Sequence, residues 1–165
     1  MNHYIMIHYV FDLDDTLIIH QKDKPIIYSN IYPDYELINH LNKLGGPCYI
    51  YTNGTGGHAL DVIERMNIKN IFEKIYSRDT IPYMKPNYKS FTAVHDDLSL
   101  RDSDVKVVFF FDDMLVNLEA ANREGWTTFW IHPDAIQGKY YPYVNQSFTD
   151  INKCLQYLEN TFSHS

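Results

Sequence analysis

The sequence predicts an α/β fold in which a doubly wound, mostly parallel sheet is flanked by helices. Two observations support this prediction. Short apolar runs typical of buried strands alternate along the chain with segments whose apolar residues have helical spacing. Polar residues, several of them acidic, follow directly after three of the apolar runs. Strands that alternate with helices pair in parallel through right-handed crossovers, so these polar residues should meet at one edge of the sheet.

The expected elements follow from periodicity and from the glycines and prolines between the periodic segments. Strands are expected at residues 4–11, 48–51, 74–76, 105–111 and 127–131. Helices are expected around residues 35–44, 59–66, 88–94, 115–121 and 148–158. The first of these helices should end at Gly45 and Gly46, and a hairpin flap is expected at 18–28. No linker, repeat or low-complexity tract divides the sequence, so we expect a single domain over 1–165.

Composition narrows the possible functions. The 165 residues are 45% hydrophobic and 21% charged, which is typical of one globular domain with a sizeable core. The formal net charge of −7 makes general nucleic-acid binding unlikely, because binding to a phosphate backbone depends on clustered Lys and Arg.

The cysteines and the apolar runs predict an intracellular protein. Cys48 and Cys154 have neither metal-ligand nor redox spacing and are expected to be buried, reduced thiols. No apolar run approaches the roughly 20 residues of a membrane helix, and the N-terminal stretch lacks the basic region of a signal peptide. We therefore expect a cytoplasmic location and no membrane partner.

The most informative segment is the run from Tyr9 to Leu17, which ends a hydrophobic strand with two carboxylates. Asp12 and Asp14 are two residues apart, and side chains along a strand alternate between its faces. Both should therefore project the same way at the carboxyl end of the strand, where open α/β sheets bind ligands. Two such groups can divide the roles of nucleophile and acid between them.

Three further segments complete a pattern. Thr52 follows the strand at 49–51, Lys85 lies in a Met-Lys-Pro segment, and Asp112 follows the apolar run at 109–111. Together with the first run, and in this order, they resemble the four signatures of the haloacid dehalogenase (HAD) superfamily. The resemblance covers roughly positions 5 to 132. It implies a HAD-like Rossmannoid core.

The resemblance also implies a reaction, a phosphomonoesterase mechanism that passes through an aspartyl-phosphate. Asp12 would attack phosphorus, while Asp14 would protonate the departing alcohol and then deprotonate the hydrolytic water. Dehalogenating members resemble this pattern without an acid at the second position, so Asp14 disfavours cleavage of a carbon–halogen bond. A divalent cation is needed between the anionic groups, and hard oxygen ligands favour Mg²⁺. The candidate metal ligands are Asp12, Asp14, Asp112 and, beside it, Asp113.

The remaining candidates would bind the phosphoryl group or support the site. Candidate phosphate-binding residues are Thr52, Asn53, Gly54 and Lys85. Thr16 should hydrogen-bond to the backbone of the nucleophile loop, and Asn117 is a possible holder of a metal-bound water. The remaining residues near the motifs are expected to have surface or supporting roles, namely His20, His58 and His132.

The gaps between the motifs are too short for a substantial cap domain, so the protein resembles capless phosphatases. From Tyr51 to Gly125 its motifs look most like those of pyrimidine 5′-nucleotidase relatives, which usually carry a helical cap. The substrate classes left open are nucleoside monophosphates, phosphoproteins and nucleic-acid end phosphates. A neighbouring subunit of a homo-oligomer is a possible cover for the open site. Candidate specificity positions in the flap are His20, Lys22, Lys24 and Tyr28.

Two other functions were weighed. A catalytically silent phosphate-binding or scaffold domain would tolerate the loss of a catalytic group, yet Asp12, Asp14, Lys85 and Asp112 are all present. A response-regulator receiver domain also phosphorylates an aspartate on a doubly wound sheet. Its lysine comes last, whereas Lys85 precedes the final acidic pair. A Mg²⁺-dependent phosphatase remains the favoured prediction.

Overall fold

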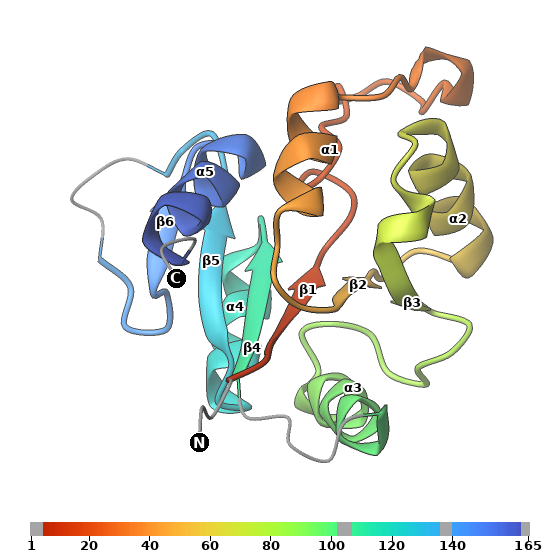
Figure 1. Cartoon of the computed structure of the whole chain (residues 1–165). Helices are drawn as coiled ribbons and strands as arrows, with labels where there is room; N and C mark the ends of the chain where they lie inside the picture. The colour runs from red at the N-terminus through yellow and green to blue at the C-terminus, as the bar shows by residue number, and fades with distance from the viewer. Residues whose placement is uncertain (1–4, 102–106, 136–139, 163–165) are drawn as a thin grey trace.

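The computed structural model describes residues 5–101, 107–135 and 140–162 and shows one six-stranded sheet (Figure 1). The strand order is β3-β2-β1-β4-β5-β6, and every neighbouring pair is parallel. The strands are β1 (Ile7–Phe11), β2 (Cys48–Tyr51), β3 (Phe72–Tyr76), β4 (Val107–Asp112), β5 (Thr127–Ile131) and β6 (Gln146–Phe148). The predicted α/β class is confirmed.

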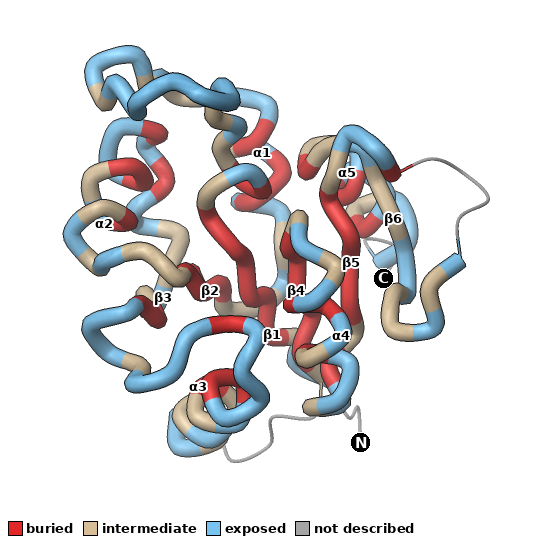
Figure 2. Tube along the Cα trace, turned by 180° about the vertical axis from the view of Figure 1, so that it is seen from behind, coloured by how far each residue is buried: buried red, intermediate tan, exposed pale blue. Residues whose placement is uncertain are grey.

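Helices cover both faces of the sheet. They are α1 (Tyr35–Asn42), α2 (Gly56–Arg65), α3 (Tyr88–Arg101), α4 (Leu115–Arg123) and α5 (Ile151–Phe162), with 3-10 turns η1 (Tyr28–Asn30) and η2 (Lys69–Ile71). Buried residues of α1, α2 and α5 belong to one hydrophobic cluster, and those of α3 and α4 belong to a second. Because the strands lie between these two layers, the central strands are buried along most of their length (Figure 2).

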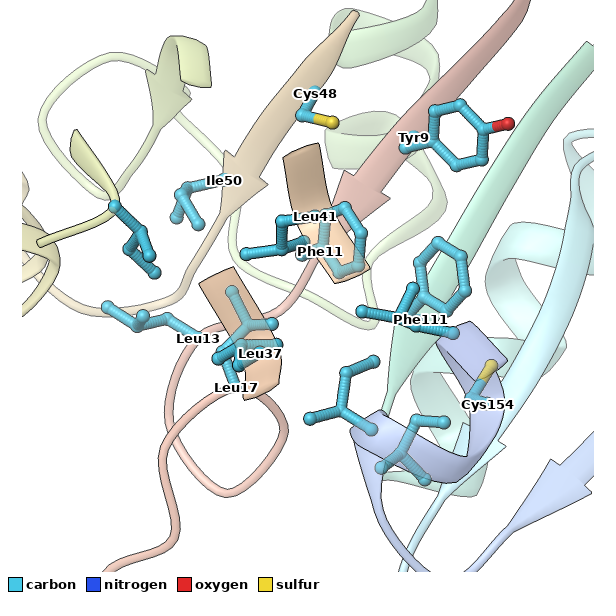
Figure 3. Packing of buried hydrophobic residues seen from close by; sticks show 14 of the residues in the cluster. Tyr9, Phe11, Leu13, Leu17, Leu37, Leu41, Cys48, Ile50, Phe111 and Cys154 are labelled. Carbon is cyan, nitrogen blue, oxygen red and sulfur yellow. The ribbon is translucent and has the colours of Figure 1, made fainter. Parts of the chain in front are cut away.

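The first cluster contains both cysteines. Cys48 lies on β2 and Cys154 on α5, and both are buried free thiols, as predicted (Figure 3). Burial raises the pKa of the Cys48 thiol to about 12, so it stays protonated at neutral pH. In the same cluster the rings of Phe11 and Phe111 stack between β1 and β4, with centroids 4.4 Å apart. This contact packs the two strands that carry the acidic residues.

Local capping sets where two helices begin. The Asp34 carboxylate accepts from the backbone N–H of Leu37 at the start of α1, and the Thr55 hydroxyl accepts from that of His58 at the start of α2. Side-chain oxygens at this position satisfy N–H groups that the helix itself leaves unpaired. The capping Thr55 places the first turn of α2 directly after β2.

Three details differ from the sequence prediction. The last helix begins at Ile151 rather than near residue 148, because Phe148 ends β6, where it pairs with Ile131. No hairpin forms at 18–28: this segment is a strap of turns with an isolated bridge between Asp14 and Ile18. Helix α1 ends at Asn42, before the two glycines. The predicted strand residues 4 and 105–106 lie outside the described residues.

The topology fixes one special position. From β1 the chain passes through α1 and α2 on one face to reach β2 and β3, and the later strands β4 and β5 are reached through α3 and α4 on the other face. The strand order therefore reverses between β1 and β4, and ligands of open α/β sheets bind at such a switch point. Asp12 follows β1 there, and Asp112 ends β4. None of the helices within the described ranges is long and apolar enough to cross a membrane.

Candidate active site

A buried lysine joins the ends of the two central strands. Lys85 Nζ lies 3.1 Å from Asp12 Oδ1 and 3.0 Å from Asp112 Oδ2, and it donates to the carbonyl oxygen of Tyr51 at 2.8 Å. The lysine side chain is 1% exposed. Asp12, Lys85 and Asp112 therefore meet at the switch point, as the motif order predicted.

The charges of this site are unusual because they are buried. The pKa of Asp12 is raised to about 6, first by burial and then by the neighbouring Asp112 carboxylate, while Lys85 opposes the shift. Asp113 has its pKa raised to about 9, first by burial and then by Asp12 and Asp112. Burial acts to lower the pKa of Lys85, but Asp112 and Asp12 outweigh it, so the lysine stays charged. One cation thus faces three crowded carboxyl groups.

The crowded carboxyls form a candidate metal centre. Ligand atoms of Asp12, Asp112 and Asp113 lie within 4.8 Å of one another. Besides Lys85, two further donors hold Asp112 in place, the backbone N–H of Met114 at 2.9 Å and the side-chain amide of Asn117 at 3.1 Å. Asn117 therefore contacts a candidate ligand directly. The predicted fourth ligand, the side chain of Asp14, is not a member of this group.

Asp14 instead lies in a cluster of its own. His20 Nε2 is 2.6 Å from Asp14 Oδ1, and His58 Nε2 is 3.0 Å from each carboxylate oxygen. On the far side of its ring, His58 Nδ1 is 2.7 Å from Tyr28 Oη. From the sequence, both histidines were expected to have surface or supporting roles, and His20 was also a candidate specificity position. Their meeting at Asp14 was not predicted, because it depends on how the strap folds back. One signal was present: His58 falls in the first turn of the helix that follows Thr52.

The second and third motifs are connected through Asn53. Its side-chain amide donates to the carbonyl oxygen of Lys85 at 3.0 Å, and its amide oxygen accepts from the N–H of Lys85 at 2.8 Å. Nearby, the N–H of Gly54 donates to the buried Thr52 hydroxyl at 3.0 Å. Among the candidate phosphate-binding residues, the Asn53 side chain is thus occupied by the backbone of Lys85 and fixes the loop that carries this lysine. Its backbone N–H and the Thr52 hydroxyl lie at the end of β2.

Thr16 interacts with the candidate nucleophile in a different way from that predicted. Its hydroxyl donates to Asp12 Oδ2 at 2.9 Å, so it contacts the carboxylate itself rather than the backbone of the loop. Of the other candidates, His132 stacks on Trp130 and accepts from the N–H of Asp134.

The strap contributes an open groove beside the Asp14 cluster. The groove has a volume of about 510 Å³, and most of its lining is apolar. The candidate specificity residues His20 and Lys24 line it; Lys22 is exposed, and Tyr28 points to His58. The exposed side chains of Ile19, Ile26 and Ile27 also lie on the strap, and the exposed Tyr32, beyond its end, lines the groove too.

Solved structures share this fold. A haloacid dehalogenase-like family hydrolase from Streptococcus pneumoniae matches with a TM-score of 0.65 and 15% identity, over 93% of this chain and 98% of that one. The L-2-haloacid dehalogenase from Xanthobacter autotrophicus, with chloropropionic acid covalently bound, matches with a TM-score of 0.61 and 12% identity, over 80% and 63% of the two chains. A HAD-hydrolase from Bacillus subtilis bound to magnesium matches with a TM-score of 0.59 and 19% identity, over 76% and 53%.

These similarities establish the fold, and a match to a family model identifies the family. The chain spans between 53% and 63% of the length of the L-2-haloacid dehalogenases compared with it. A comparison with curated proteins finds no match. The model of the haloacid dehalogenase-like hydrolases matches residues 18–131, which include Lys85 and Asp112 and begin after Asp14. This protein belongs to the haloacid dehalogenase-like hydrolase family.

Proposed function

We propose that the protein is a Mg²⁺-dependent phosphomonoesterase that works through an aspartyl-phosphate on Asp12. The observation that carries the proposal is the pairing of two acidic centres at the end of β1. Asp12 is buried and bound by Lys85, whereas Asp14 is partly exposed and bound by imidazoles. A nucleophile that attacks an anion needs fixed positive charge beside it, and an acid needs access to the leaving group.

The donor set fits a hard cation. Asp12, Asp112 and Asp113 offer carboxylate oxygens, which Mg²⁺ prefers, and burial together with mutual repulsion raises the pKa of Asp12 and of Asp113, effects that a bound cation would oppose. When bound, the metal would offset the negative charge of the phosphoryl group. The Thr52 hydroxyl, buried at the same edge of the sheet, would donate to a phosphoryl oxygen. Lys85, whose three N–H groups are used by Asp12, Asp112 and Tyr51, would supply positive charge beside it.

In the first step an Asp12 carboxylate oxygen attacks phosphorus. The new bond is the acyl phosphate bond; the bond between phosphorus and the ester oxygen breaks, and its electron pair leaves with that oxygen. Protonated Asp14 gives its proton to this oxygen, so an alcohol departs. Thr16 and Lys85, which hydrogen-bond to the Asp12 carboxylate, hold it in place for the attack.

In the second step water attacks phosphorus, and Asp14 takes its proton. The bond between phosphorus and the Asp12 oxygen breaks, which releases inorganic phosphate and restores both carboxyl groups. Asp14 thus ends the cycle protonated, ready for another ester.

Asp14 also separates this reaction from dehalogenation. A halide leaves as a stable anion and requires no proton, whereas an alkoxide does. An acid held by two histidines next to the nucleophile is therefore explained by a phosphate ester and not by a haloacid. The structural neighbours named as dehalogenases share the fold at 12–20% identity, which leaves the substrate open.

The substrate we propose is a phosphorylated molecule whose leaving group extends into the strap groove. Nucleoside monophosphates, as in the pyrimidine 5′-nucleotidase relatives, phosphoproteins and nucleic-acid ends remain the candidate classes. No separate cap domain is formed by the residues that the structure describes, so a bulky substrate or a second copy of the chain has access to this edge.

The test is release of inorganic phosphate from 4-nitrophenyl phosphate with Mg²⁺, with EDTA, and with the Asp12→Asn variant. Asp23→Asn is the matched control, because Asp23 is exposed on the strap. We expect activity that requires Mg²⁺, disappears in Asp12→Asn and persists in Asp23→Asn. Halide release from 2-chloropropionate without any phosphate release would overturn the proposal, and inactivity on a panel of esters and haloacids would favour a binding role.

A further inference from the structure

We propose that His20 and His58 are positioning residues that orient the Asp14 carboxyl group toward the leaving group. This inference rests on the proposed function and deepens it. The two imidazoles come from separate segments, His20 from the strap after β1 and His58 from the first turn of α2. Their convergence on one carboxylate goes beyond the four motifs.

The hydrogen-bond pattern leaves one position open on Asp14. Oδ1 accepts from both His20 and His58, whereas Oδ2 accepts from His58 alone. A carboxylate oxygen has two lone pairs, so Oδ1 is saturated and Oδ2 keeps a lone-pair position. The side chain of Asp14 is also 31% exposed, compared with 19% for His20 and 16% for His58. The pair thus leaves Oδ2 as the oxygen that can exchange a proton with the substrate.

Tyr28 fixes the role of the His58 ring. When Asp14 is ionised, or carries its proton on the remaining lone-pair position of Oδ2, the oxygens that face His58 accept, so the Nε2 atom carries the proton. The other nitrogen of a neutral ring then accepts, and Tyr28 Oη lies 2.7 Å from it as the donor. The Tyr28 ring meets His58 edge-on and lies under the guanidinium of Arg65, at 5.9 Å. The strap and α2 therefore hold the imidazole from both sides.

Gly54 makes room for this ring. A Cβ atom at Gly54 would lie 3.3 Å from His58 Cδ2 and 3.4 Å from Thr52 Oγ1. The glycine of the second motif thus allows the phosphate-binding end of β2 and the Asp14 cluster to lie side by side. His20 also lines the 510 Å³ groove, so the group that holds Asp14 is in contact with the space proposed for the leaving group.

A positioning role predicts different effects on two kinds of substrate, whereas loss of folding would affect both alike. Protonation by Asp14 matters most when the leaving group is a poor one, so turnover of an alkyl phosphate depends on the acid far more than turnover of an aryl phosphate. Disturbing the orientation of Asp14 should therefore lower kcat selectively for alkyl esters. Damage to the fold or to phosphate binding would lower activity toward both esters, or raise KM for both.

The experiment compares 4-nitrophenyl phosphate with an alkyl phosphate in the wild type and in His20→Ala, His58→Ala, His20→Gln and His58→Gln, with His132→Gln as control. We expect each alanine variant to lower kcat for the alkyl ester by about 10- to 100-fold, part of the 10²- to 10⁴-fold that a general acid contributes. The aryl ester should change by less than about threefold, KM should be unchanged, and glutamine should restore part of the loss because it keeps an N–H donor.

Two outcomes would overturn the inference: equal losses on both esters, or a change confined to KM. A wild type that releases phosphate from neither ester would instead remove the proposed function, and this inference with it, so the two failures are distinguishable. An independent readout is ¹⁵N NMR of the His58 ring. We expect the proton on Nε2 in the wild type and a shifted Nδ1 resonance in Tyr28→Phe; a proton on Nδ1 alone would contradict the assignment.

Discussion

Asp12 and Asp14 are two residues apart in sequence and have opposite surroundings. Asp12 is 7% exposed and is bound by Lys85 and Thr16. Asp14 is partly exposed and is bound by two imidazoles from the strap and α2. One strand end therefore supplies a carboxylate that is fixed inside the molecule and another that meets solvent. Different environments for paired carboxyl groups are how proteins assign them different chemical tasks.

The backbone after β1 explains this separation. Leu13 points into the hydrophobic core with no exposure, so its neighbours on either side face the opposite way. Asp15 then adopts a left-handed conformation with φ 62°, and its N–H donates to the carbonyl oxygen of Ile18 at 2.6 Å. This turn carries the chain out to the strap immediately after Asp14. The comparison predicts that the Asp12 group governs stability, whereas the Asp14 group governs turnover alone.

The largest effect on stability is expected from Lys85→Met. The substitution leaves Asp12 and Asp112 buried without their cation, and breaking a buried pair costs about 3–5 kcal/mol. Urea unfolding without metal measures the loss. Lys74→Met is the control, because Lys74 pairs with Asp97 at a partly exposed site, where about 1 kcal/mol or less is expected. Equal losses of unfolding free energy in the two variants would show that burial does not make the Lys85 group more important for stability.

The next effect is the response to metal. Mg²⁺ at 100 times its Kd should stabilise the wild type by about 2.7 kcal/mol, seen as a rise in Tm. Asp112→Asn should remove this rise, because it removes a candidate ligand at the end of β4. Asp14→Asn should retain it, because the Asp14 side chain lies outside the ligand group. If Asp14→Asn also lost the rise in Tm with Mg²⁺, Asp14 would belong to the metal-binding group together with Asp12 and Asp112.

A smaller effect is expected from Thr16→Val. The variant keeps the shape of the side chain and removes the donor to Asp12, and a hydrogen bond to a charged group contributes about 1.5–3 kcal/mol. The pKa of Asp12 should rise further, because this hydrogen bond favours the carboxylate. Unfolding experiments above pH 6 test the prediction. Thr92→Val, at an exposed hydrogen bond with Glu124, is the control and should change little.

The smallest change in stability is expected from Asp14→Asn. Its side chain is partly exposed, so unfolding free energy should change by no more than about 0.5 kcal/mol. Turnover of an alkyl phosphate should nevertheless fall by about 100-fold or more, because the proton donor is lost. Parallel urea unfolding and steady-state kinetics measure both quantities. A variant that is as destabilised as Lys85→Met would show that Asp14 belongs to the buried group.

Sequence reasoning placed the elements with strong local signals. Strands β2 and β5 match the predicted ranges residue for residue, because each is a buried apolar run bounded by turn-forming residues. Strand β6 was missed, because it has three residues and its Phe148 has helical spacing from Ile151. In so short a segment, periodicity cannot distinguish a strand from the start of a helix. Pairing with β5, a contact distant in sequence, decides the outcome.

The same division applies to the site. The meeting of Asp12, Lys85 and Asp112 follows from motif order, because parallel strands bring their ends to one edge. The contacts of His20 and His58 with Asp14 depend on the path of the strap, which has no periodic pattern. The hydrogen bond that Asn117 donates to Asp112 was likewise not predicted. Hydrogen-bond partners are tertiary details that residue spacing alone does not specify.

The two hydrogen bonds between the Asn53 side chain and the backbone of Lys85 have a mechanical consequence. They attach the segment before α3 to the end of β2. The position of the lysine ammonium is therefore set by the sheet rather than by the helix that follows it. The loop of Lys85 is thus held by β2 at a point that precedes α3 in the chain. We therefore expect the position of the ammonium beside Asp12 to depend on the sheet rather than on the outer layer of helices.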